Sequence, residues 1–305
     1  MQRTLETRID RNETKSGATA VGMTDILMIT YNRPAYTRLS LERLLSTCDE
    51  SMRVWIWHNG RDEETLRVVR ELADHPRVAA VHHSPENKKL REPTNWLWSQ
   101  ADGEYISKVD DDCLVPDAWI ETLRRAHADV PGFGVLGCWR FPEEDFYPEL
   151  AAQKIRDFGG RHRVLQNCWV EGSGYLMKRD CLRSQGLLGR DQSFSAYCIE
   201  LARAGWINGW YYPFLFQEHM DDPRSSHTLL RSDEDLARYL PLSAQRCGVS
   251  TLAEWQEQLR RSARELQVAS IDPRRYGRRT LRRILPALGR RVRRLLHRNG
   301  NGGSG

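Results

Sequence analysis

Three consecutive carboxylates, Asp110, Asp111 and Asp112, directly follow a hydrophobic run and precede Pro116. The run, residues 104–109, is rich in β-branched and aromatic side chains and predicts a short buried strand, so the carboxylates lie where that strand leaves its sheet. Ligands of open α/β sheets bind at this edge. Adjacent carboxylates repel one another, and a divalent cation with oxygen ligands relieves the repulsion. The stretch therefore predicts either a metal site able to grip a diphosphate or a solvated acidic turn.

Units of strand, turn and helix precede these carboxylates and must position them. After each of the first two strands comes a short turn and then a helix, recognised by apolar residues at spacings of three, four and seven. The predicted strands span 25–31, 53–58, 78–82 and 104–109, and the helices that separate them begin near residues 34, 62 and 94. Strands that alternate with helices in this way predict an α/β fold with a mostly parallel sheet and helices on both faces.

The chain after residue 130 has weaker patterns. Residues 141–166, rich in Pro, Glu and Gly, read as irregular, and 168–177 as a strand broken by Gly172-Ser-Gly174. Thr251 and Glu254 form a capping box that opens a C-terminal helix. The remaining predicted elements are strands at 133–139 and 206–214 and a helix at 194–204.

Composition narrows the class of protein. The chain has 305 residues, of which 40% are hydrophobic, enough for a sizeable core. It has no apolar run of membrane-spanning length and no signal peptide at its charged N-terminus, so we expect a cytoplasmic protein. The seven cysteines are odd in number and never form a Cys-x-x-Cys pair, which argues against a zinc site and against a disulfide framework.

Several of these pieces, taken in order, resemble the nucleotide-sugar half of a family 2 glycosyltransferase with the GT-A fold. The pieces are Thr30-Tyr-Asn-Arg-Pro34, His58-Asn-Gly60, Asn95 ahead of a strand, the aspartates 110–112, and Pro116. The resemblance is good from Thr24 to Leu123 and weaker from Trp139 to His219. It implies a Rossmann-like, mostly parallel sheet with helices on both faces, followed by C-terminal helices.

The resemblance also assigns the donor and metal sites. It implies donor binding by Thr30, Asn32, Arg33, His58, Asn59, Asn95 and Asp110, and Mn²⁺ or Mg²⁺ binding by Asp111, Asp112 and His219. The run of three aspartates leaves this register open by one position. A UDP-sugar is the expected donor, although many members have an aspartate where His58 stands, which leaves the nucleotide open.

The general base of an inverting transfer is not at its usual place. Members of the family carry a Glu-Asp pair before the helix that ends near Gly205, but here Ser193 and Phe194 occupy those positions. A carboxylate must still take the proton of the acceptor hydroxyl. Asp191 and Glu171 are the two candidates, and Asp191 is slightly favoured. A catalytically silent relative is the alternative.

The resemblance and the charge distribution give the expected organisation. We expect a leader at 1–22, a catalytic domain at 23–225 with a donor half at 23–125 and an acceptor half at 133–225, a helical extension at 226–270, a basic amphipathic tail at 271–298 and a flexible end at 299–305.

The tail suggests partners. Residues 274–298 contain eleven arginines and no acidic residue, and leucines recur there at helical spacing. We expect this tail to bind an anionic membrane surface, which suits a lipid-linked or other glycan acceptor met at the inner face of the membrane. Nucleic acid is the alternative partner, and a DNA-modifying glycosyltransferase would combine both readings. Sugar-nucleotide synthesis is disfavoured because no Gly-rich phosphate loop follows the first strand.

Overall fold

The computed structural model describes residues 20–277. Residues 1–19 of the predicted leader and residues 278–298 of the predicted basic tail lie outside this range, as does the predicted end at 299–305. Residues 20–22, predicted as part of the leader, belong to the first strand. The strands are β1 Ala20–Thr30, β2 Met52–Asn59, β3 Val78–Ser84, β4 Gly103–Asp110, β5 Cys113–Leu114, β6 Phe133–Gly137, β7 Ile155–Phe158, β8 His162–Asn167, β9 Tyr175–Lys178, β10 Ile207–Tyr212 and β11 Glu218–His219. The helices are α1 Pro34–Ser46, α2 Glu63–Leu72, α3 Arg91–Gln100, α4 Trp119–Asp129, α5 Pro148–Ala151, α6 Arg179–Gln185, α7 Phe194–Arg203, α8 Asp233–Tyr239, α9 Leu242–Cys247 and α10 Leu252–Val268, with short 3₁₀ turns at Glu143–Asp145 and Pro273–Arg275.

Nine strands form one twisted sheet in the order β3-β2-β1-β4-β9-β6-β10-β8-β7. The first four strands are mutually parallel, as the alternation of strands and helices predicts. Beyond β4 the sheet is mixed, because β9 runs antiparallel to both β4 and β6, and the hairpin of β7 and β8 adds an antiparallel edge. A separate two-stranded pair joins β5 to β11. The predicted α/β class, with a mostly parallel sheet, is confirmed.

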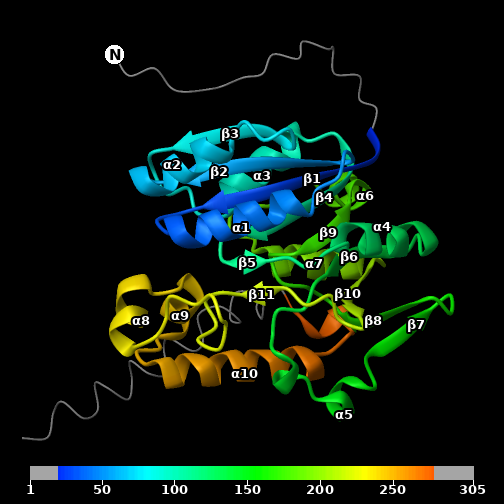
Figure 1. The fold of residues 1–305 in the computed structure, drawn as a ribbon. Coiled ribbons are helices and arrows are strands. Elements are labelled where there is room, and N and C mark those ends of the chain that lie inside the picture. Colours follow the sequence, from blue (N-terminus) through cyan, green and yellow to red (C-terminus); the bar gives the residue numbers. More distant parts are fainter. Residues whose placement is uncertain (1–19, 278–305) are drawn as a thin grey trace, which may run out of the picture.

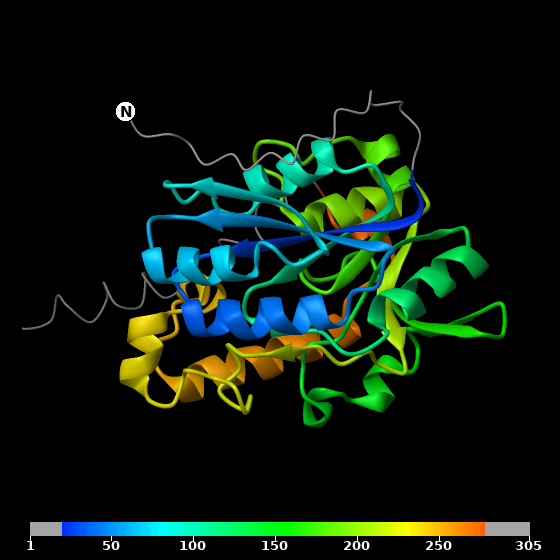
Figure 2. The same ribbon diagram turned by 45° about the horizontal axis from the view of Figure 1, so that its top comes forward.

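The central strands are buried on both faces because successive side chains of a strand point to opposite sides. In β1, Ile26 and Met28 pack with α1, α2 and α4 on one face. Leu27 and Ile29 belong to the core on the other face, which includes α3, α6, α7 and α10. Figures 1 and 2 show α1 and α4 in front of the sheet and α3 and α7 behind it. The carboxyl ends of β1 to β4 are thereby left as one open edge.

Local signals explain where several helices begin. Pro34 occupies the first turn of α1, where a missing backbone N–H does no harm. The Asp62 carboxylate accepts a hydrogen bond from Thr65 N at 2.8 Å and caps α2. Thr251 caps α10 by accepting from Glu254 N, and the Glu254 carboxylate accepts its closest backbone hydrogen bond from Ser250 N.

Two sequence predictions for the second half were wrong. Residues 141–166 are not irregular throughout, since they contain α5, β7 and most of β8. Gly159 and Gly160, both at positive φ, make the turn between β7 and β8, and a Gly-Gly pair is a hairpin signal that could have found it. Residues 168–177 are not one broken strand either. Cys168–Gly174 is an irregular crossing segment, and only its end enters β9.

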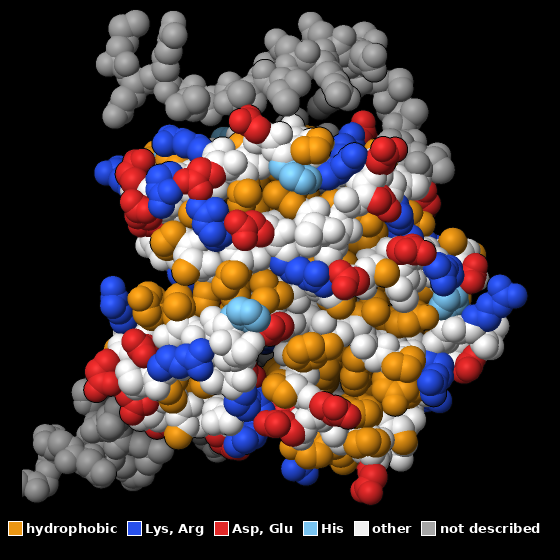
Figure 3. All heavy atoms as spheres, viewed as in Figure 1, with side chains coloured by type: hydrophobic (Ala, Val, Ile, Leu, Met, Phe, Trp, Pro, Cys, Tyr) orange, Lys and Arg blue, Asp and Glu red, His pale blue; other side chains and the backbone are white. Residues whose placement is uncertain are grey.

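Charged side chains of both signs gather over α2 at the upper left of Figure 3. Among them Arg67 bridges Glu64 and Glu71, and Arg38 of α1 also reaches Glu71. Such exposed pairs add little stability and mark a solvated face. Within residues 20–277 no helix is both long and apolar enough to cross a membrane.

Candidate active site

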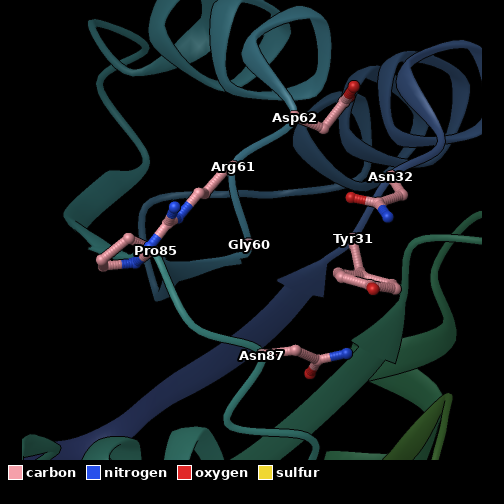
Figure 4. A pocket seen from close by; sticks show the side chains of 7 residues that line it. All are labelled: Tyr31, Asn32, Gly60, Arg61, Asp62, Pro85 and Asn87. Carbon is pink, nitrogen blue, oxygen red and sulfur yellow. The ribbon is translucent and has the colours of Figure 1, made fainter.

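A pocket of about 500 Å³ opens at the carboxyl ends of β1, β2 and β3. Tyr31 and Asn32 follow β1, three residues from Gly60 to Asp62 follow β2, and Pro85 and Asn87 follow β3. Figure 4 shows Tyr31, Asn32 and Asn87 on one side of the pocket and Arg61 and Pro85 on the other. Tyr31 is 41% exposed, and its ring presents a flat apolar face. A planar heterocycle can stack on such a face.

Gly60 is required at the base of this pocket. Its φ is +93°, a conformation that disfavours any side chain, and a Cβ there would lie 3.1 Å from the Tyr31 ring. The backbone of β2 can therefore turn away directly beneath the ring. Asn32, at φ +52°, is also left-handed, which an asparagine tolerates.

The aspartates at the end of β4 belong to a larger group of charged side chains that we call the carboxylate cluster. Its five carboxyl groups and three cations are Asp110, Asp111, Asp112, Glu171 and Asp221 with Arg33, Lys108 and Arg140. The carboxyl groups outnumber the cations, which favours the binding of a further cation. Burial raises the pKa of Asp221 to about 8 and that of Asp111 to about 6, which reduces this excess of negative charge near pH 7.

Arg33 holds three carboxylates of this cluster at once. Its guanidinium donates to Asp111 at 3.0 Å, to Asp112 at 2.9 Å and to both oxygens of Asp221 at 2.9 and 2.7 Å. Asp111 also accepts from Tyr31 N at 3.0 Å and from the Thr37 hydroxyl at 3.3 Å. Both Asp111 oxygens are therefore engaged by α1 and the loop before it, and this carboxylate ties that loop to β4.

Asp112 lies beside His219, which arrives from a distant part of the chain. Pairing of β5 with β11 sets Cys113 opposite His219, and Met220 N donates to Asp112 O at 2.8 Å. Ligand atoms of Asp112, Cys113 and His219 all lie within 4.8 Å of one another. A carboxylate and an imidazole at this separation could share one divalent cation and leave its other positions to ligand oxygens.

The protonation states favour Asp112 and His219 over Cys113 as ligands. Burial lowers the pKa of His219 to about 4, and the Arg140 charge adds to this effect, so its imidazole is neutral near pH 7. Burial alone would raise the pKa of Asp112, but the Arg33 charge beside it outweighs burial and holds that pKa below its ordinary value. Burial raises the pKa of the Cys113 thiol well above its usual range, so it stays protonated. The available donors are thus one oxygen and one nitrogen ligand, without a thiolate.

Asp110 points to a different part of the cluster. Lys108 forms an ion pair with it, and the Asp110 side chain remains 34% exposed. The backbone N–H of Asp110 donates to the Ser173 hydroxyl at 2.9 Å, and Gln217 also donates to that hydroxyl, at 3.3 Å. Gly174 makes this crossing possible, because its φ is +62° and a Cβ would lie 1.8 Å from the Gln217 carbonyl oxygen. The crossing segment Cys168–Gly174 is therefore held against the end of β4.

Glu171 and Arg140 complete the cluster from the second half of the chain. Arg140 Nη2 lies 2.6 Å from Glu171 Oε1, and Arg140 Nη1 lies 3.3 Å from His219 Nε2. The second oxygen of Glu171 is buried and has no hydrogen-bond partner within residues 20–277. Burial raises the pKa of Glu171 above its ordinary value, although Arg140 opposes the rise.

The last helix supports the cluster from below. Trp255 of α10 donates its indole N–H to Asp221 O at 2.7 Å. Asp222 next to it pairs with Arg224, which also reaches Asp145 at 2.7 Å. Figure 1 shows α10 running beneath β11. The segment that carries His219 and Asp221 is thus fixed by contacts outside the sheet.

Besides Arg33 and Asp110, four more of the predicted donor-binding side chains have partners within the protein. Thr30 Oγ1 and His58 Nδ1 lie 2.9 Å apart in the core, and burial lowers the pKa of His58 to about 4. Asn59 accepts from Lys88 N at 3.0 Å and donates to Lys89 O at 3.1 Å, which shapes the loop that bears Asn87. Asn95 bonds to both backbone groups of Leu188 at 3.0 and 2.9 Å. These contacts place them around the site as supports.

Asp191 lies apart from this group. It is exposed in the turn before α7, and no hydrogen bond or ion pair joins it to the carboxylate cluster among the described residues. Of the two predicted base candidates, only Glu171 is brought to Asp110 and Arg140. Sequence reasoning missed Tyr31, Arg140 and the Arg33–Asp221 pair. The Tyr-Asn-Arg-Pro turn is a signal for Tyr31, whereas no pattern in the sequence marks Arg140.

Comparison with known proteins agrees with this arrangement. Residues 25–200 match the model of glycosyl transferase family 2. A glucosyl-dolichyl phosphate glucuronosyltransferase of Haloferax volcanii is 26% identical over 172 residues, 53% of this chain and 54% of that protein. A chondroitin synthase of Escherichia coli is 33% identical over 100 residues, 32% of this chain and 14% of that protein. The chain therefore matches about half the length of the first relative and a small part of the second.

The fold has a solved counterpart. A mannosyltransferase from Pyrobaculum calidifontis, in complex with GDP-mannose and Mn²⁺, superimposes with a TM-score of 0.55 at 18% identity, over 81% of this chain and 70% of that chain. This likeness supports the GT-A fold predicted from the sequence. Because the family model covers more than half of the chain, the protein is a member of glycosyl transferase family 2.

Proposed function

We propose that this glycosyltransferase moves a sugar from a nucleoside diphosphate to a hydroxyl group of a glycan or lipid-linked acceptor, with Mn²⁺ or Mg²⁺ as cofactor. The observation that carries the proposal is the juxtaposition of Asp112 with His219 at the same sheet edge as the Tyr31 pocket. The Tyr31 N–H bonds to Asp111, so the pocket and the carboxylate cluster are adjacent. A nucleoside in the pocket would direct its diphosphate toward Asp112.

The residues around the pocket suit the nucleoside. The exposed Tyr31 ring would stack on the base, and the amides of Asn32 and Asn87 offer hydrogen bonds to its edge. The partly exposed Asp110 carboxylate would accept from the ribose hydroxyls. Thr30, His58 and Asn59 would support this wall from within. We take a UDP-sugar as the first candidate donor.

The donor set fits a hard divalent cation. We assign the metal to Asp112 and His219, with Asp111 holding Arg33 and the loop before α1 in place. When bound, the ion neutralises negative charge on the leaving diphosphate. Arg33 keeps the Asp112 carboxylate ionised and oriented. Asp112 and His219 would thus hold the ion beside the place of the diphosphate.

Two observations bear on the identity of the acceptor. The Haloferax volcanii relative bears the name of an enzyme of dolichyl phosphate sugars, which is one reason to consider a lipid-linked acceptor. The predicted basic tail, of which residues 278–298 lie outside the described range, is another. Co-sedimentation with anionic vesicles should differ between the full chain and a chain ending at Asp272. Equal pelleting of the two would remove the membrane role of the tail and the proposed residence at the cytoplasmic face.

A donor panel tests the core of the proposal. The full chain is incubated with UDP-glucose, UDP-glucuronic acid, UDP-N-acetylglucosamine and GDP-mannose, each with Mn²⁺, Mg²⁺ or chelator. Release of nucleoside diphosphate by slow hydrolysis is measured. We expect one donor to respond and the response to vanish in chelator. Undiminished release in chelator would refute the metal assignment, and no release from any donor would favour a catalytically silent relative.

A further inference from the structure

Glu171 is the member of the carboxylate cluster whose hydrogen bonding is incomplete. Among the described residues, its Oε2 is the only buried carboxylate oxygen without a hydrogen-bond partner. The other four carboxyl groups of the cluster are held by Arg33 or Lys108. A buried acceptor left unpaired is destabilising, so an arrangement of this kind is expected where a ligand completes it.

The position of Glu171 suits a group that meets the substrate. Its crossing segment is fixed against the end of β4, because Asp110 N donates a hydrogen bond to the Ser173 hydroxyl. Next to Glu171, a Cβ added at Gly172 would lie 3.9 Å from the Lys108 side chain. Through Arg140, Glu171 is one side chain removed from His219. The Glu171 side chain is 20% exposed, and the terminal torsion of a glutamate is soft, so a small rotation brings Oε2 to an entering group.

We propose that Glu171 is the catalytic base that takes the proton of the acceptor hydroxyl, in place of the carboxylates absent at Ser193 and Phe194. This inference rests on the proposed function. As the hydroxyl oxygen forms its bond to the anomeric carbon, its proton passes to Glu171 Oε2. The bond from that carbon to the phosphate oxygen breaks, and its electron pair leaves with the nucleoside diphosphate. Arg140 is a positioning residue that holds the other oxygen, Oε1.

Three observations favour Glu171 over the other carboxylates as the base. Asp110 is paired with Lys108 and Asp221 with Arg33, so neither has a free oxygen of comparable burial. Burial raises the pKa of Glu171, which strengthens it as a base relative to an exposed carboxylate. Asp191, the other candidate, makes no contact with the cluster among the described residues.

The test compares four forms of the full chain: wild type, Glu171→Gln, Glu171→Asp and Asp191→Asn. The donor that the wild type hydrolyses best is used with Mn²⁺, and both nucleoside diphosphate release and donor affinity are measured. We expect Glu171→Gln to lose activity by about a hundredfold or more, the usual effect of removing a general base, with donor affinity and melting temperature nearly unchanged. Glu171→Asp should retain more activity than Glu171→Gln, and Asp191→Asn should resemble the wild type.

Addition of sodium azide distinguishes a role of Glu171 as a general base from a purely structural role. Azide is an anionic nucleophile with no proton to lose, so it should form a glycosyl azide and restore part of the release in Glu171→Gln. Loss of activity without rescue by azide, or a parallel loss of donor affinity, would assign Glu171 a structural role and overturn the proposal. Glu171→Gln as active as the wild type would overturn it as well. A wild type with no activity toward any donor would instead refute the proposed function.

Discussion

The first half of the described chain, residues 20–129, and the second half, residues 133–222, build the same site in different ways. In the first half the site residues follow parallel strands, and their positions are set by backbone pairing along β1 to β4. In the second half they lie on irregular segments or on the two-residue strand β11, and single side-chain contacts hold these segments, such as Gln217 on Ser173 and Trp255 on Asp221. The comparison teaches that backbone pairing positions the site residues of the first half, whereas individual side-chain contacts position much of the second.

The strongest test asks whether both halves share one metal ion. Asp112→Asn from the first half and His219→Ala from the second should each reduce metal-stimulated turnover by about a hundredfold or more, since a loss of about 3 kcal/mol of charge stabilisation has that effect. His227→Ala is the matched control, because His227 pairs with Glu218 at the surface. If His219→Ala keeps full Mn²⁺ dependence, the second half does not contribute to the metal site.

Substitution of two glycines tests how strongly the crossing segment depends on the close approach of Gly174 to Gln217. Gly174 and Gly159 have similar φ values of +62° and +64°, but only Gly174 would place a Cβ against Gln217, whereas Gly159 has nothing within 4 Å. Gly159→Ala should cost about 1 kcal/mol for its left-handed backbone. Gly174→Ala should cost about 1–3 kcal/mol more through overpacking. Urea unfolding measures both, and equal losses would mean that the close approach at Gly174 is unimportant.

The pocket of the first half offers a more moderate effect. Tyr31→Ala should weaken donor binding by about tenfold, because stacking of a base on an aromatic ring contributes about 1–3 kcal/mol. Tyr31→Phe keeps the ring and should bind almost as the wild type does. Titration calorimetry with the responding donor distinguishes the two. Equal weakening in both variants would show that the hydroxyl, and not the ring face, contacts the donor.

The smallest effect concerns pH. His58 and His127 of the first half are buried, and burial lowers their pKa values from 6.5 to about 4 and about 3. The folded protein therefore takes up protons less readily than the unfolded chain, so the stability these neutral imidazoles contribute is complete above about pH 6.5 and declines as the pH falls toward 4. Urea unfolding at pH 7.5, 6 and 5 should show this decline. A His127→Gln variant should show a shallower one, and an unchanged slope would contradict the assignment.

Sequence reasoning reached the first half more fully than the second for a physical reason. Periodicity and capping are local properties of the sequence. They predict the strands at 25–31 and 104–109 and the helix that begins near Asp62. The proximity of Asp112 and His219 is also predicted from the sequence, because polar residues after apolar strands mark a sheet edge. Asp111, predicted as a third metal ligand, instead bonds to Arg33, Tyr31 N and Thr37. The roles of Arg140 and Asp221 depend on contacts between segments 31 or more residues apart, and no local pattern encodes them. The sequence also does not predict which of the three aspartates contacts Lys108, Arg33 or His219, because this depends on the direction of each side chain.

The indole of Trp255 on Asp221 also bears on how this protein can be shortened. The family match ends at residue 200, before His219 and before α10. A fragment that ends at residue 200 would lack both His219 and Asp221, the partner of Arg33. A fragment that ends just after Asp222 would keep both residues but would lack α10, whose Trp255 holds Asp221. Similarity to relatives therefore marks where common ancestry is visible, not where the functional unit stops. A truncated enzyme intended for crystallography or screening must extend at least through Val268.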